Sequence, residues 1–259
     1  MTDTGDPRIK LTFEGHLALI TLARPEKLNA LDLEMVHALE RAAHLVDADR
    51  NLRCAIITGE GDKSFCAGGD IEAWSSIAPQ EFGMHWVRDG HRAFDALARM
   101  RQPLIAALNG HTLGGGLELA VCADFRIAAD HIKIGSPETG LGIIPGWSGT
   151  QRTVRRFGVQ VTRRMCVLGE IFTADEARTL GIVDQVVAKG ETLGAAREMA
   201  ARIMARGPQA TQATKLLVNA AEGEDREKTL EALAGMAAAG STELKHGVEA
   251  FRDKKKPEF

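Results

Sequence analysis

The chain lacks a strong excess of charge of one sign, and it lacks a long apolar segment. Its 259 residues carry a formal net charge of −3, so no basic field for general nucleic-acid binding is expected. No apolar run is long enough to span a bilayer. The start of the chain, with Asp3 and Asp6, resembles neither a signal peptide nor a transit peptide. We therefore expect a cytoplasmic protein with no membrane segment.

Patterns typical of disulfide frameworks and metal sites are also missing. The chain has four widely spaced cysteines without a C-x-x-C pair, namely Cys54, Cys66, Cys122 and Cys166. Most lie in apolar runs, which indicates reduced packing residues. The eight histidines form no H-E-x-x-H or similar pattern, so no metal site is expected. The hydrophobic content of 44% is enough for a substantial core in one large α/β domain, with or without an appendage.

A glycine-rich turn near the middle of the chain is the most informative feature. Residues 104–108 predict a short buried strand, Asn109-Gly110 ends it, and residues 114–116 are all glycine. Residues 117–123 then predict a helix that is apolar on almost every side and therefore belongs inside the protein. The first N–H groups of such a helix have no partner within it and carry the positive end of its dipole. These N–H groups can therefore stabilise a negative charge that develops on a ligand.

Glu118 lies in the first turn of this helix, and its side chain leans back toward the same ligand. A buried acid is costly unless it is paired or used, so Glu118 is either a structural acid bonded to a turn or a catalytic group. A second glycine pair, Gly68-Gly69, follows the predicted strand at residues 54–58. Alone it indicates only a turn. Together with the glycine helix, it can supply the second N–H donor of an oxyanion hole.

Three motifs in sequence order resemble the enoyl-CoA hydratase/isomerase (crotonase) family. They are Ala67-Gly68-Gly69-Asp70, then Asn109-Gly110 through Gly114-Gly115-Gly116-Leu117-Glu118-Leu119-Ala120, and finally Pro137-Glu138 followed by Gly142-Ile143-Ile144-Pro145-Gly146. Each motif alone is weak evidence for the family. Their order and spacing match along nearly the whole chain, so the combination is specific.

The resemblance implies a crotonase-like α/β fold, with a spiral of strand-strand-helix turns over residues 1–190. It implies that the backbone N–H groups of Ala67 and Gly115 bind the thioester oxygen of an acyl-CoA, and that Glu118 and Glu138 are the catalytic acids. Hydratases of the family have both acids, whereas simple isomerases usually keep only the one at the Glu138 position. The implied reaction is reversible hydration of a 2-enoyl-CoA, as in fatty acid metabolism. Coenzyme A enters with the substrate, so no separate cofactor is expected.

The resemblance also implies further contacts with the substrate. Lys27 and Leu28 would lie against CoA, with Lys27 as a phosphate partner, and Phe251 and Lys254 would contact the adenine and a phosphate. A solvated lysine and a solvated basic tail are the alternatives. The full set of expected substrate-binding residues is Lys27, Leu28, Ala67, Gly68, Gly69, Asp70, Ile71, Gly115, Trp147, Phe251 and Lys254.

Trp147 departs from the family pattern, which often has a smaller residue in this turn. We expect Trp147 to narrow or reshape the acyl pocket. The segment between Ile71 and Arg99 covers this pocket in relatives, so Trp74 and Trp86 are further candidates for its lining. Plain core packing or a subunit contact is the alternative for both.

From Glu191 onward the sequence predicts alanine-rich helices, which have too little core to be stable alone. The resemblance implies that residues 191–259 form homotrimers, which pair into hexamers. Two further functions within the family remain open, a double-bond isomerase that uses Glu138 alone and another acyl-CoA lyase. A non-catalytic RNA-binding member is a third alternative, disfavoured by the acidic balance and the acid pair.

Overall fold

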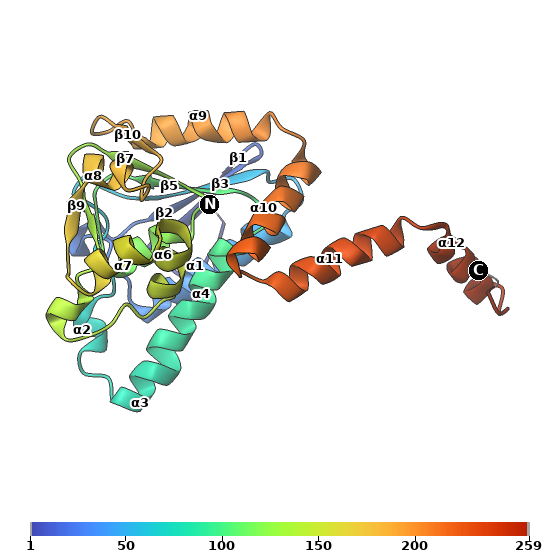
Figure 1. Ribbon diagram of the computed structural model, residues 1–259, viewed down its shortest axis with the longest axis horizontal. Helices are drawn as coiled ribbons and strands as arrows, with labels where there is room; N and C mark the ends of the chain where they lie inside the picture. The colour runs from blue at the N-terminus through green and yellow to red at the C-terminus, as the bar shows by residue number, and fades with distance from the viewer. Residues whose placement is uncertain (1, 258–259) are drawn as a thin grey trace. The chain divides into compact units, whose positions relative to one another are not determined.

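A computed structural model describes residues 2–257 of the chain (Figure 1). It divides into two compact units, Met1–Gln212 and Ala213–Phe259. Among the described residues, no helix has both the length and the apolar character that a membrane span requires.

The first unit is built on a six-stranded sheet. In spatial order its strands are β1 (Ile9–Glu14), β2 (Leu17–Leu22), β3 (Cys54–Gly59), β5 (Leu104–Leu108), β7 (Phe125–Ala129) and β10 (Gln185–Val187). β1 and β2 are antiparallel, and all other neighbours are parallel. Every residue of β3 and β5 is buried, as expected for parallel strands that are covered on both faces.

A second sheet of four short strands lies beside the predicted glycine turns. Its order is β4 (Ser64–Cys66), β6 (His111–Leu113), β8 (Lys133–Gly135) and β9 (Ile171–Thr173). β4 follows β3 along the chain, β6 follows β5, and β8 follows β7. The chain therefore makes repeated turns in which each sheet receives one strand.

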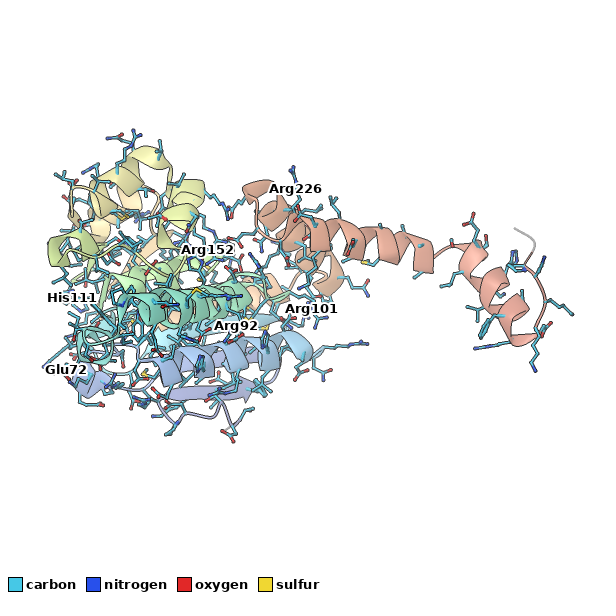
Figure 2. The ribbon with its side chains drawn as sticks, turned by 90° about the horizontal axis from the view of Figure 1, so that it is seen from below. Glu72, Arg92, Arg101, His111, Arg152 and Arg226 are labelled. Atoms are coloured by element: carbon cyan, nitrogen blue, oxygen red, sulfur yellow. The ribbon has the colours of Figure 1, made fainter. Side chains whose placement is uncertain are left out.

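Two long helices support the pocket region from one side. α1 (Leu33–Ala48) begins at Asp32, whose side chain accepts a hydrogen bond from the Met35 N–H at 3.0 Å. α4 (Arg88–Ala98), which carries Arg92 (Figure 2), packs along α1. Arg92 pairs with Glu40 of α1 at 2.7 Å.

Shorter helices connect these elements. They are the 3-10 helix η1 (Pro25–Lys27), α2 (Ile71–Trp74), α3 (Pro79–Glu81), the π-helix η2 (Phe82–Val87), α5 (Gly115–Val121), the 3-10 helix η3 (Glu138–Leu141), α6 (Gly149–Phe157), α7 (Val159–Cys166) and α8 (Ala174–Thr179). α8 begins with a capping box formed by Thr173 and Glu176. This cap holds α8 against the preceding strand β9.

α9 (Thr192–Met204) completes the core of the first unit. It crosses β3, β5 and β7 (Figure 1), and Ala196 and Ala200 pack in one cluster with Ile56 and Ile105. The opposite face of the sheet belongs to a larger core that includes α1 and α4. Because α9 buries one face of the sheet, the compact unit extends to Gln212, whereas we had placed the boundary at residue 190.

The C-terminal region is helical, as predicted. α10 (Pro208–Glu222) runs across the boundary at Gln212, and α11 (Arg226–Ala239) and α12 (Thr242–Arg252) follow. Large apolar side chains are exposed on these helices, namely Leu217, Val218, Leu230, Met236, Leu244, Val248 and Phe251. Exposed apolar surface of this kind is typical of protein contacts. It is consistent with an oligomerisation role, which stays a prediction.

Candidate active site

Glycines bring helix α5 close to the second sheet. Gly114 has φ of 55° and ψ of −128°, a conformation that glycine adopts readily and other residues do not. A Cβ atom on Gly116 would overlap the Cys66 carbonyl group of β4. These glycines therefore allow α5 to begin directly against the strand that precedes Gly68 and Gly69.

Glu118 is buried in the first turn of α5, where its side chain is 3% exposed. Its Oε1 atom accepts hydrogen bonds from the N–H groups of Trp147, at 2.7 Å, and Gly149, at 2.8 Å. Burial, followed by the nearby Glu138 carboxylate, raises the pKa of Glu118 to about 7, although bonds from Trp147, Gly149 and Gly146 lower it. Glu118 therefore changes its protonation state near neutral pH.

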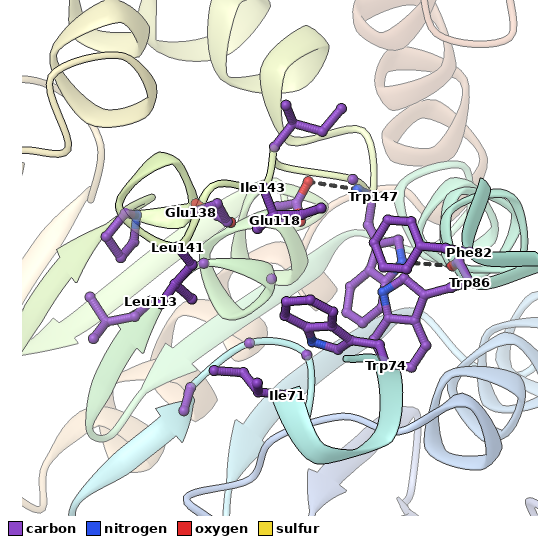
Figure 3. Close-up of a pocket in the computed structure, with 18 residues that line it drawn as sticks. Ile71, Trp74, Phe82, Trp86, Leu113, Glu118, Glu138, Leu141, Ile143 and Trp147 are labelled. Carbon is purple, nitrogen blue, oxygen red and sulfur yellow. Dashed lines mark hydrogen bonds between the residues drawn. The ribbon is translucent and has the colours of Figure 1, made fainter. Parts of the chain in front are cut away.

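Glu138 lies in the same pocket as Glu118 (Figure 3). It begins η3, and the Ser136 hydroxyl donates to its Oε2 atom at 2.8 Å. Its Oε1 atom is buried and has no hydrogen-bond partner within the described chain. Burial raises the pKa of Glu138, opposed by its own backbone N–H and by Ser136. The fold thus places two carboxyl groups with raised pKa values around one cavity.

Backbone N–H groups border this cavity at two glycines. The Gly115 N–H lies in the first turn of α5, where the helix itself supplies no hydrogen-bond partner. The backbone of Gly68 is close to it, since a Cβ atom on Gly68 would lie 3.1 Å from the Gly115 nitrogen. The Ala67 N–H, which we expected to be the second oxyanion donor, donates instead to the Leu28 carbonyl at 3.1 Å. The N–H groups of Gly68 and Gly69 have no partner among the described residues, and both glycines line the pocket.

The remaining wall of the pocket is strongly aromatic. Trp74, Phe82, Trp86 and Trp147 line it (Figure 3). The Trp147 indole Nε1–H donates to the Trp86 carbonyl at 2.9 Å, and the two rings lie 5.1 Å apart. The cavity volume of the pocket is about 190 Å³, below the roughly 300–1,000 Å³ of sites for drug-sized ligands. Trp74, Trp86 and Trp147 thus lie where we expected pocket residues.

Comparison with known proteins places this site in a family. The model for enoyl-CoA hydratase/isomerase matches residues 12–259. The chain belongs to this family. A crotonyl-CoA hydratase from Syntrophomonas wolfei subsp. wolfei is 39% identical, over 97% of each chain. An (E)-benzylidenesuccinyl-CoA hydratase from Thauera aromatica is 37% identical, over 80% of each chain.

A solved structure agrees with this assignment. The crystal structure of an enoyl-CoA hydratase from Bacillus anthracis has a TM-score of 0.81 at 32% identity, covering 97% of this chain and 98% of that chain. The spiral of alternating strands described above is therefore a crotonase-like fold. The predictions of the family, the fold and an enzyme of the hydratase type are confirmed.

Some of the other predicted site residues line the pocket, and others make contacts outside it. Gly68 and Ile71 line the pocket. Asp70 instead caps α2 through the Glu72 N–H at 3.1 Å and pairs with Arg24 at 2.9 Å, so its contacts in the structure are structural. Lys27 is exposed and pairs with Glu72 at 2.5 Å. Its role in binding CoA stays a prediction.

Three more predicted positions lie outside the pocket wall. Leu28 is 44% exposed, in a left-handed backbone conformation with φ of 54°. Phe251 and Lys254 belong to the second unit, where Phe251 is 83% exposed. The predicted contacts of these residues with CoA stay predictions. Among the residues that the structure describes, no group of three or more His, Cys, Asp or Glu side chains has the geometry of a metal site.

A contact that supports Glu118 was missing from our sequence reasoning. The Ser148 hydroxyl and His91 Nδ1 lie 2.6 Å apart. Ser148 separates the two residues whose N–H groups bind Glu118, and its φ of 72° is in the left-handed region. No motif connects His91 with Ser148, so only the fold reveals this contact.

Substitutions of Ser148 in this enzyme distinguish its backbone role from its hydroxyl role. Ser148→Ala loses the hydroxyl contact to His91 and keeps the left-handed strain, so we expect a loss of stability of about 1 kcal/mol. Ser148→Gly also loses the hydroxyl but adopts a positive φ freely, so it should be more stable than the alanine variant. Urea unfolding of the three proteins measures both differences. Equal destabilisation by alanine and glycine would show that backbone strain at this position has no effect.

Proposed function

We propose that this enzyme adds water reversibly across the double bond of a 2-enoyl-CoA and gives a 3-hydroxyacyl-CoA. The observation that supports this function is the pair of buried glutamates in one pocket, both with raised pKa values. Two acids whose surroundings differ in this way can act as acid and base in one step. Relatives named as hydratases support the same reaction.

The thioester oxygen binds between the two glycine segments. The N–H groups of Gly115 and Gly69 take the role of oxyanion donors, because the N–H of Ala67 is engaged by Leu28. As water adds, negative charge moves from the double bond to the thioester oxygen in an enolate-like state. Donors arranged in advance stabilise this charge, and each contributes roughly a hundredfold or more in rate.

The two glutamates divide the proton transfers. Ionised Glu118 orients a water molecule and takes its proton while the water oxygen bonds to the β-carbon. Glu138 gives its own proton to the α-carbon, so hydrogen and hydroxyl are both added and no charge is left on the product. The unpartnered Oε1 atom of Glu138 suits this role because no protein group competes for its proton. Dehydration uses the same groups with their roles reversed.

We propose that the other end of the substrate lies near the turn of Lys27 and Leu28. The Lys27 ammonium would exchange its exposed partner Glu72 for a CoA phosphate. Phe251 and Lys254 would contact the adenine and a phosphate of CoA in a neighbouring subunit of a homotrimer or hexamer. Coenzyme A is then the only non-acyl group required, and it arrives with the substrate.

Hydration of crotonyl-CoA by the purified protein tests the proposed function. We expect loss of the conjugated thioester absorbance, with turnover in the range of 1 to 10³ per second that is typical of enzymes. The expected product is 3-hydroxybutyryl-CoA, identified by mass and chromatography. A folded protein that binds CoA but only converts a 3-enoyl-CoA to the 2-enoyl isomer would contradict hydration and favour the isomerase alternative.

A further inference from the structure

The Trp147 indole fits into its place because glycine stands at two of its contacts. A Cβ atom on Gly90 would overlap the indole ring. A Cβ on Gly115 would lie 2.9 Å from Cζ3, too close for a carbon atom, whereas one on Gly69 would be in ordinary contact with Cη2 at 3.5 Å. Gly90 stands inside helix α4, where glycine is less favourable than alanine. The packing of Trp147 explains this otherwise unfavourable glycine.

The ring of Trp147 is also held in one orientation. Its Nε1–H donates to the Trp86 carbonyl at 2.9 Å, and the Phe94 ring packs against it with centroids 5.2 Å apart. Only 2% of Trp147 is exposed. The accepting carbonyl belongs to the π-helix η2, a type of distortion that is frequent at functional sites. The ring therefore cannot move aside without breaking several contacts.

The Trp147 ring forms a buried part of the pocket wall. It packs beneath Gly69 and Gly115, the residues to which the proposed function assigns the thioester oxygen. The acyl carbons next to the thioester therefore meet Trp147, and the ring blocks the way toward Gly90 and Phe94. A longer chain that leaves along Leu141 and Ile144 meets side chains that are 63% and 67% exposed. There each methylene group of the chain gains little of the free energy that full burial provides.

We propose that Trp147, seated on Gly90, restricts this enzyme to short 2-enoyl-CoA substrates of the crotonyl type. The proposal rests on the proposed function of the same pocket, and it names the substrate class and the residue that sets it. Differences of one methylene in a closed apolar pocket change kcat/KM by about 10-fold to 200-fold. The restriction is therefore large enough to measure with two chain lengths.

The test compares crotonyl-CoA with trans-2-decenoyl-CoA in the wild type and in Trp147→Leu, Trp147→Ala and Trp147→Phe. We expect the wild type to favour crotonyl-CoA at least tenfold in kcat/KM. The leucine and alanine variants open the space toward Gly90 and should raise the ratio of decenoyl to crotonyl activity at least tenfold. The phenylalanine variant is the matched control, because it keeps an aromatic floor and should retain the wild-type preference. All variants retain the backbone N–H that binds Glu118.

Equal activity of the wild type on both chain lengths would overturn the proposal, as would an unchanged ratio in a folded leucine or alanine variant. Binding of the saturated analogues butyryl-CoA and decanoyl-CoA, followed by calorimetry, provides a readout that does not need hydration. If the wild type hydrates neither enoyl-CoA, the proposed function fails. The binding measurement still supports the length limit if only Trp147→Leu gains affinity for decanoyl-CoA, and it refutes the limit if the wild type binds both analogues equally.

Discussion

Glu138→Gln is expected to lower kcat/KM for crotonyl-CoA hydration by about 10³, since general acid catalysis commonly contributes 10²-fold to 10⁴-fold. The glutamine amide is the same size as the carboxyl group but cannot give a proton to the α-carbon. Its oxygen can still accept the hydrogen bond from Ser136, which lies 2.8 Å from Oε2 in the native protein. The fold around the pocket should therefore stay intact while the reaction stops.

Deuterium incorporation gives a second measure of this loss of activity. In deuterium oxide, the wild type should incorporate deuterium at the α-carbon of the product, and Glu138→Gln should do so at the same strongly reduced rate as hydration. Glu81→Gln is a matched control, because this acid is exposed on α3 and is replaced by the same amide. Hydration by Glu138→Gln within tenfold of the wild type would contradict the role of Glu138 as the acid.

The sequence predicted those parts of the site that depend on local geometry. Glu118 could be assigned because an acid in the first turn of an apolar helix is necessarily close to the N–H groups of that turn. The strand before this helix was predictable in the same way, from a short apolar run that ends at Asn109-Gly110. The order of the three motifs then linked this region to Glu138, which comes from a separate loop.

Orientation and long-range packing were not predictable from the sequence. The Ala67-Gly68-Gly69 motif indicates that a donor is present, but not which peptide plane faces the pocket, and the structure leaves the N–H groups of Gly68 and Gly69 unpartnered rather than that of Ala67. The dependence of Trp147 on Gly90 joins the turn before α6 to helix α4 and leaves no local pattern. The boundary of the first unit differs from residue 190 for a similar reason, since helix composition does not show that α9 covers the sheet.

Glu118→Gln is expected to combine a large loss of activity with a gain of stability at alkaline pH. Hydration should fall by about 10³, because an amide cannot take the proton of the attacking water. In the wild type, Glu118 must be ionised to take this proton. Hydration is therefore predicted to decline as the pH falls below the Glu118 pKa of about 7. An acid limb in the pH profile of kcat/KM near this value measures the effect.

The gain of stability follows from the direction of the pKa shift. The pKa of Glu118 in the folded protein is about 7, above its ordinary value of 4.5, so folding favours the protonated form. The stability that this proton provides is fully present below about pH 4.5, and it is lost as the pH rises through about 7. Glutamine stays neutral at every pH, so the variant loses no stability in this way. The wild type should thus become less stable than the variant with rising pH, by on the order of 3 kcal/mol.

Urea unfolding of both proteins at pH 5 and pH 8 measures this difference, with Glu198→Gln on the exposed face of α9 as the matched control. The control should show no comparable change of relative stability between the two pH values. An inactive Glu118→Gln protein that is also less stable than the wild type at pH 8 would identify Glu118 as a structural acid that holds the turn of Trp147 and Gly149. An inactive but more stable variant would show that the ionised Glu118 carboxylate lowers the stability of the folded protein, which is the expected property of a catalytic base.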